Sequence, residues 1–182
     1  FLTGTAQPEE LAARAAELGY SALALTDQSG LYGLPRFAKA AQQAGLRPIC
    51  GAELRVDGYP LLLLCEDAVG YRNLCKLITR EKMQPRAQGE AAQDLTLTAL
   101  AQHASGLIAL TGGSEGRIGA AIERGDVEEA EEVLDRLRGT FGEKNLAVEL
   151  QVHFDESEDR RNATLCELAH RYEVPLVLTN DV

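Results

Sequence analysis

The feature that most constrains the fold is a regular alternation of short apolar runs with amphipathic helical segments. Each apolar run has the length of a buried strand; they cover residues 22–26, 47–50, 60–65, 107–110, 146–150 and 176–178. The intervals have helical periodicity, most clearly over residues 127–137, where one face is apolar and the other acidic. Repeated βα units of this kind predict one α/β domain with a mainly parallel sheet, closed as a barrel or doubly wound.

The charge of the chain limits what it can bind. The formal net charge is −10 over 182 residues, and no basic stripe is present to displace counterions from a nucleic-acid backbone. We therefore expect DNA to be held only through other parts of the protein. No apolar run is long enough to cross a membrane. Four cysteines without Cys-x-x-Cys spacing predict buried, reduced thiols, which is typical of a cytoplasmic protein.

Polar side chains follow the predicted strands. Asp27, Glu53, His153 and Asp181 each come shortly after an apolar run. In parallel βα folds the carboxyl ends of the strands share one rim, and chemistry collects there. Carboxylates and imidazole are the ligands that divalent cations select. The sequence therefore predicts these four side chains on one rim, with the Gly112-Gly113 pair beside them as an anion-binding loop or a tight turn.

Each of these residues also has a structural interpretation. Asp27 and Asp181 occupy positions where aspartate often forms a turn or caps a helix. His153 lies in a polar segment that is typical of an exposed surface. Glu53 is less easily explained by turn formation, so a site role and a surface role remain open. These patterns alone indicate a βα-repeat domain with a metal or phosphate rim as one possibility.

Seven stretches in order along the chain resemble the PHP domain of bacterial DNA polymerase III alpha subunits and their error-prone relatives. They cover residues 8–19, 22–27, 30–33, 45–53, 70–78, 106–112 and 179–182, and include the sequence Gly70-Tyr71-Arg72-Asn73-Leu74. The resemblance implies a distorted, TIM-like (β/α)7 barrel spanning residues 1–182 as a single PHP domain. It also implies a rim that holds up to three metal ions, Zn or Mn, and supports phosphoester chemistry or 3'-5' exonuclease activity in intact members.

Compared position by position with that family, the metal site of this chain is degenerate. Glu53 and Asp181 match family ligands. Four positions do not: Thr3 stands where the family often has aspartate, Gln28 and Pro60 where it has histidine, and Gly113 where cysteine is common. An amide is a weak cation ligand and glycine has no side chain to offer. The resemblance therefore implies a domain with no catalytic residue of its own and no metal cluster.

Three functions remain to be distinguished. The first is a structural or interaction module inside a replicative or error-prone DNA polymerase, whose partners are the other domains of the same chain. The second is an active metal-dependent phosphoesterase or exonuclease, completed by residues outside this chain. The third is a separate metabolic phosphatase of the histidinol-phosphate type, which the polymerase-like stretch over residues 70–74 disfavours. The chain begins at Phe1 and stops directly after a predicted strand, so we expect the domain to be incomplete at both ends.

Overall fold

The computed structural model describes residues 6–83, 94–152 and 156–179. Within these ranges, six strands form one sheet in the order β1-β2-β3-β4-β5-β6. The strands are β1 (Ala22–Gln28), β2 (Arg47–Val56), β3 (Tyr59–Cys65), β4 (Leu107–Leu110), β5 (Leu146–Gln151) and β6 (Leu176–Thr179). The helices are α1 (Pro8–Glu17), α2 (Leu34–Gln43), α3 (Ala68–Met83), α4 (Leu97–Ala101), α5 (Arg117–Glu123), α6 (Val127–Phe141) and α7 (Glu156–Arg171).

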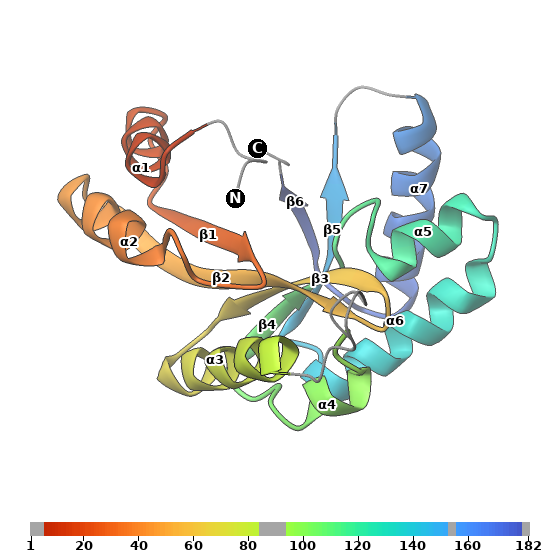
Figure 1. Ribbon diagram of the computed structural model, residues 1–182. Coiled ribbons are helices and arrows are strands. Elements are labelled where there is room, and N and C mark those ends of the chain that lie inside the picture. The colour runs from red at the N-terminus through yellow and green to blue at the C-terminus, as the bar shows by residue number, and fades with distance from the viewer. Residues whose placement is uncertain (1–5, 84–93, 153–155, 180–182) are drawn as a thin grey trace, which may run out of the picture.

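The sheet is strongly curled, and the helices lie along its outer, convex side (Figure 1). Helices α1 and α2 pack on β1 and β2, α3 packs mainly on β3, and α6 and α7 pack on β4 and β5. The result is a single α/β domain with a half-barrel sheet, in which β1 and β6 are the two edges of the described part. None of the helices in the described ranges has the length and apolarity needed to cross a bilayer.

The prediction of a mainly parallel sheet is confirmed for three pairings, β1 with β2, β4 with β5, and β5 with β6. The exception is β3, which is antiparallel to both of its neighbours. The reason is a two-residue turn, Asp57-Gly58, in which both residues have positive φ, +49° and +93°. Such a turn matches the twist of an antiparallel hairpin. Strand β2 consequently continues to Val56 instead of ending at Cys50, and Glu53 lies inside it.

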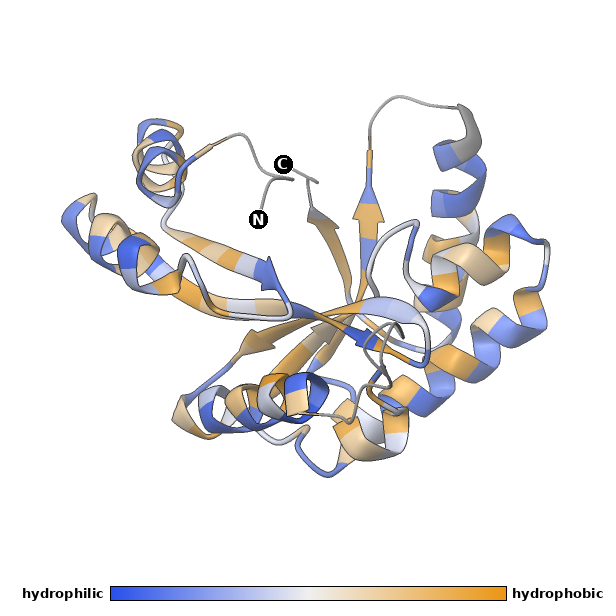
Figure 2. Cartoon of the chain, in the orientation of Figure 1, coloured by the Kyte–Doolittle hydropathy of each residue, from blue (hydrophilic) through white to orange (hydrophobic). Residues whose placement is uncertain are grey.

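The core lies between the outer face of the sheet and the helices, and aliphatic side chains fill it. In Figure 2 the strands and the sheet-facing sides of the helices are predominantly hydrophobic. The largest fully buried side chains in the described residues are leucines together with Ile118, and Phe37 is the one aromatic among them. The four cysteines are free, as expected, but each is half-buried and not fully buried. Cys50 and Cys65 pack at the margin of the main core.

A close contact explains one stretch of the polymerase-like sequence. Helix α3 begins against the turn that precedes β4, and a Cβ added at Gly70 would lie 1.7 Å from the Gly106 carbonyl oxygen. One turn later, the Asn73 side-chain amide donates to the Ser105 carbonyl oxygen at 2.9 Å. The side chain of Asp67 accepts from the Gly70 N–H at 2.8 Å. Gly70 and Asn73 therefore fix the approach of α3 to β4, which is a packing role.

Candidate functional site at the carboxyl rim of the sheet

Side chains on the inner, concave face of the sheet define the candidate site. Along β2, alternation assigns the faces: Ala52 and Leu54 are buried in the core beneath the helices, so Glu53 between them points to the inner face. Gln28, at the end of β1, is the register partner of Glu53. Glu53 is half-buried and Gln28 is exposed. A carboxylate and an amide therefore lie side by side at the carboxyl end of the first two strands.

Asp27 lies at the same end of the sheet but points to the opposite face. Its register partner is Ala52, which belongs to the helix-packed core. The Asp27 carboxylate accepts a hydrogen bond of 2.7 Å from the backbone N–H of Gly33, the residue before α2. This contact is the loop-forming role that aspartate commonly has after a strand. Asp27 therefore anchors the β1–α2 connection, and its side chain does not join Glu53.

Pro60 and Gly113 reach the same rim through different strands. Because β3 is antiparallel, its first residues lie beside the last residues of β2, and Pro60 pairs with Arg55. The chain leaving β4 crosses closely over this point, since a Cβ added at Gly112 would lie 2.5 Å from the Pro60 carbonyl oxygen. At Gly113, with φ of +57°, an added Cβ would lie 2.4 Å from the Gln151 side-chain oxygen Oε1. The Gln151 side chain thus fills the space beside Gly113.

Three of the residues predicted for the site, Thr3, His153 and Asp181, lie outside the described residues. Among residues 6–83, 94–152 and 156–179, no three His, Cys, Asp or Glu side chains are grouped so that they could hold a metal ion. The described donors at the rim, chiefly Glu53 and the amides Gln28 and Gln151, do not by themselves fit a divalent cation.

A buried carboxylate in the middle of β5, Glu149, is not among the residues predicted for the site. Its neighbours Val148 and Leu150 belong to the helix-packed side, so Glu149 points inward, and it is only 5% exposed. One carboxylate oxygen accepts from the Gly112 N–H at 3.1 Å, and the other accepts from the Thr179 hydroxyl. Its own backbone N–H donates to the Thr111 hydroxyl at 3.0 Å. Glu149 therefore joins the ends of β4, β5 and β6. A lone acid inside the apolar run over residues 146–150 was the available signal.

A second buried acid, Glu81 near the end of α3, lies next to the turn that follows β1. It is 5% exposed. One of its oxygens accepts from the Ser29 hydroxyl at 3.0 Å, while the other, Oε2, has no hydrogen-bond partner among the described residues. Ser29 has a positive φ of +49°, and its N–H donates to the Glu53 carbonyl oxygen at 2.8 Å. Glu81 thereby supports the turn that follows β1.

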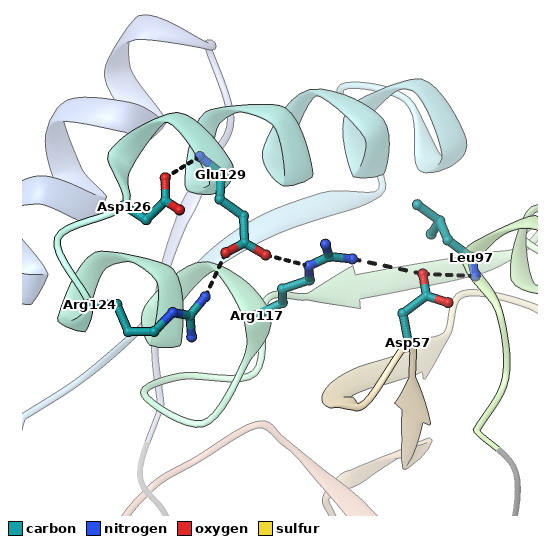
Figure 3. A network of polar contacts seen from close by, with 6 residues as sticks. All are labelled: Asp57, Leu97, Arg117, Arg124, Asp126 and Glu129. Atoms are coloured by element: carbon teal, nitrogen blue, oxygen red, sulfur yellow. Dashed lines mark hydrogen bonds and ion pairs between the residues drawn. The ribbon is translucent and has the colours of Figure 1, made fainter.

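An ionic network ties the tip of the β2–β3 hairpin to α5 and α6 (Figure 3). Arg117 donates to Glu129 at 3.0 Å and lies 3.9 Å from Asp57, and Arg124 contacts the second oxygen of Glu129 at 2.5 Å. These two arginines, Arg117 first, hold the pKa of the Glu129 carboxyl below its ordinary value. The adjoining cavity, lined in part by Tyr59 and Arg117, has about 30 Å³ of free space. That volume suits one or two water molecules and is far below the ~300 Å³ of small-molecule sites.

Comparison with known proteins agrees with this arrangement. The chain is 38% identical to an error-prone DNA polymerase of Cutibacterium acnes over 98% of its length, and 37% identical to one of Anaeromyxobacter sp. over 100%. It spans only 17% and 16% of those two proteins. In structure it is similar to a Bifidobacterium adolescentis protein whose assignment as a metal-dependent phosphoesterase is provisional, with a TM-score of 0.64, 12% identity, and coverage of 97% of this chain and 82% of that one.

A Chromobacterium violaceum amidohydrolase, solved with bound sulfate and no metal, is similar to the same degree. Its TM-score is 0.64 at 15% identity, and the match covers 96% of this chain and 81% of that one. At these identities the two structures establish the fold alone. The model of the PHP domain family matches residues 1–153, which is most of the chain. With a curled sheet, helices on its outer side and this match in sequence, the chain belongs to the PHP domain family.

Proposed function

We propose that this chain is the N-terminal PHP domain of an error-prone DNA polymerase and serves there as a structural and interaction module. Its partners are the remaining domains of the same polymerase, and its sheet is completed to the (β/α)7 barrel of the family. The relatives that support the proposal are several times longer than this chain, which spans 16–17% of them. Polymerase chemistry then belongs to the rest of the protein.

The observation that carries the module proposal is the contact between Gln151 and Gly113. In the family, a cysteine is common at the position of Gly113. Here the Gln151 side chain occupies the space that the Cβ of such a residue would need. Gln28 and Pro60 replace two further ligands on other strands, and Glu149 uses both carboxylate oxygens in hydrogen bonds. These contacts support a rim rebuilt with hydrogen bonds between protein groups, where the family holds cations.

The charge of the chain supports a limited role in DNA contact. With a net charge of −10, this domain has no evident excess of Lys and Arg side chains to neutralise DNA phosphates. We propose that the polymerase meets DNA through its other domains and works in the cytoplasm. In a fluorescence-anisotropy titration at physiological salt, the PHP domain should not approach micromolar affinity for duplex DNA. Micromolar binding that weakens steeply with added salt would contradict this part of the proposal.

The alternative is a working metal-dependent phosphoesterase or 3'-5' exonuclease using Zn or Mn. The fold it shares with a provisionally assigned metal-dependent phosphoesterase favours this possibility. Glu53 would then be the ligand from the described part of the rim, and His153 and Asp181 would join it. A bound cation would supply a Lewis acid and a nucleophilic water for phosphoester cleavage.

Elemental analysis of the full-length polymerase distinguishes the two functions. After exposure to zinc and manganese and extensive dialysis, we expect less than stoichiometric metal and no manganese-dependent exonuclease activity. The triple variant Gln28→His, Gly113→Cys, Gln151→Ala restores two ligand types and removes the obstructing amide, so its metal content should rise. Adding Glu53→Gln to that variant is the matched control and should lower the content again. Stoichiometric metal in the unmodified protein, together with exonuclease activity, would overturn the module proposal.

A further inference from the structure

Three half-buried cysteines gather on the outer face of the sheet, away from the rim. Cys50 lies near the start of β2, Cys65 ends β3, and Cys75 is on α3, which packs on both strands. The neighbouring register pair is Gly51 with Leu64, so the next residues outward, Cys50 and Cys65, face each other across the antiparallel hairpin. Both also pack at the margin of the same core cluster, which places their side chains on one face.

The spacing of this pair suits a covalent link. Directly opposed residues in an antiparallel pair have Cα atoms about 4.5–5.5 Å apart. Disulfides span Cα separations of about 4.4–6.8 Å, so the separation expected for Cys50 and Cys65 lies in the range that a disulfide can bridge. Cys75 lies on the neighbouring helix, where its thiol raises the pKa of Tyr71 one turn earlier. It is therefore close to the pair but on a different element.

The two opposed thiols interact with each other. A hydrogen bond from the Cys65 thiol to the Cys50 sulfur lowers the pKa of Cys50. The same bond, followed by burial and the nearby charges of Cys50, Cys75 and Asp67, raises the pKa of Cys65. Because the thiolate is the reactive form of cysteine, a hydrogen bond from one thiol to the sulfur of the other favours a reactive thiolate within the pair.

We propose that Cys50 and Cys65 form a reversible thiol–disulfide pair that reacts with low-molecular-weight disulfides. One thiolate of the pair attacks one sulfur of the small disulfide; the S–S bond breaks and one small thiolate leaves. The second thiol of the pair then loses its proton and attacks the protein sulfur of the mixed disulfide, releasing the second small thiol. The two protein thiols are oxidised to one disulfide, and the small disulfide is reduced to two thiols. The product covalently fixes the hairpin that carries Glu53.

Peptide mapping of the full-length protein tests this pair directly. Trypsin cuts after Arg55, Arg72 and Lys76, so Cys50, Cys65 and Cys75 fall on the separate peptides 40–55, 56–72 and 73–76. After incubation with oxidised glutathione, and alkylation of the remaining thiols, mass spectrometry should find peptide 40–55 joined to 56–72. Dithiothreitol should reverse the link. Cys166, on peptide 162–171, is the internal reference and should be alkylated in most molecules.

Two variants separate the pair from its neighbour. Cys75→Ser is the matched control and should keep the 40–55 to 56–72 link in full. Cys65→Ser should lose the link and leave glutathione attached to Cys50. The proposal is overturned if Cys50 or Cys65 links instead to Cys75, or if Cys166 takes up glutathione as fast as Cys50. If Cys65→Ser does not fold, the link between peptides 40–55 and 56–72 is still measured in the unmodified protein and in Cys75→Ser, and its absence from both overturns the proposal.

Discussion

The side chain of Gln151 occupies the space beside Gly113 that any other residue there would need: an ideal Cβ on Gly113 would be 2.4 Å from Gln151 Oε1. Gln151 ends β5, and Gly113 lies three residues after the end of β4, the parallel neighbour of β5. The position also carries a positive φ of +57°. A side chain at residue 113 therefore has a conformational cost, and the end of the Gln151 side chain must also move to make room for it.

We expect Gly113→Ala to lower the free energy of unfolding by about 1–3 kcal/mol, because of the contact with Gln151 and the positive φ. Adding Gln151→Ala should recover the steric part, which urea denaturation of the single and double variants measures as a coupling energy. Gly142→Ala is the matched control, since Gly142 has a φ of +77° with nothing within 4 Å of an added Cβ. Strict additivity of the two changes would show that the residues do not obstruct each other.

Much of this fold follows from the sequence. The apolar runs located all six described strands, and the helical periodicity located the helices between them. The direction of β3 was missed, although Asp57-Gly58 is a known hairpin signal. Periodicity alone cannot give strand direction, and the apolar run over residues 60–65 indicated only a buried strand.

The site was less predictable than the fold. Asp27 and Glu53 do lie at one end of the sheet, but on opposite faces, because Asp27 pairs with Ala52 and Glu53 pairs with Gln28. Glu149 was hidden inside an apolar run, and its three polar partners come from residues 111, 112 and 179, far from it in sequence. Only the three-dimensional register brings these groups together.

Replacement of Glu149 should destabilise the end of the sheet. Glu149→Gln keeps the shape but removes an acceptor from either the Gly112 N–H or the Thr179 hydroxyl. We expect a loss of about 1–3 kcal/mol in the free energy of unfolding, since the site is buried. Glu167→Gln, at an exposed position on α7, is the control and should change stability little. Equal effects of the two changes in urea denaturation would argue against a structural role for Glu149.

Replacing Glu81 by glutamine should raise the free energy of unfolding, in contrast to the loss expected for Glu149→Gln. Oε2 of Glu81 is buried without a partner among the described residues, while Oε1 accepts from Ser29. Glu81→Gln keeps the acceptor and removes a buried charge, so we expect a gain of about 1 kcal/mol in stability. Glu81→Ala, which also leaves Ser29 without an acceptor, should be destabilising. Thermal unfolding followed by circular dichroism checks both, and a loss in both variants would mean that Oε2 has a donor elsewhere.

The Glu129 network should make stability depend on acid pH. The pKa of Glu129 is lowered from 4.5 in the folded protein. The ionised carboxylate therefore stabilises the fold fully above pH 4.5, and this stabilisation is lost as the pH falls from 4.5 through the lowered pKa. The Glu129 side chain is 25% exposed. We therefore expect Glu129→Gln to cost at most about 1 kcal/mol near neutral pH. The difference from the unmodified protein should shrink below pH 4.5 in urea titrations. Glu132→Gln, an exposed control on the same helix, should follow the unmodified profile; a constant Glu129→Gln difference would contradict the assignment.

The two-residue turn at Asp57-Gly58 has a consequence for how the chain reaches its native state. Among the described strand pairings, β2 with β3 is joined by only two residues, whereas the others require a crossover or a long connection. Because only two residues connect these strands, their pairing has the lowest contact order among the described strands. Short loops close in well under a microsecond and hairpins form within microseconds, so this pairing can form early. We expect β2 and β3 to form the folding nucleus onto which the later parallel strands add. The strand that breaks the parallel pattern would then be the one that sets the register for all the rest.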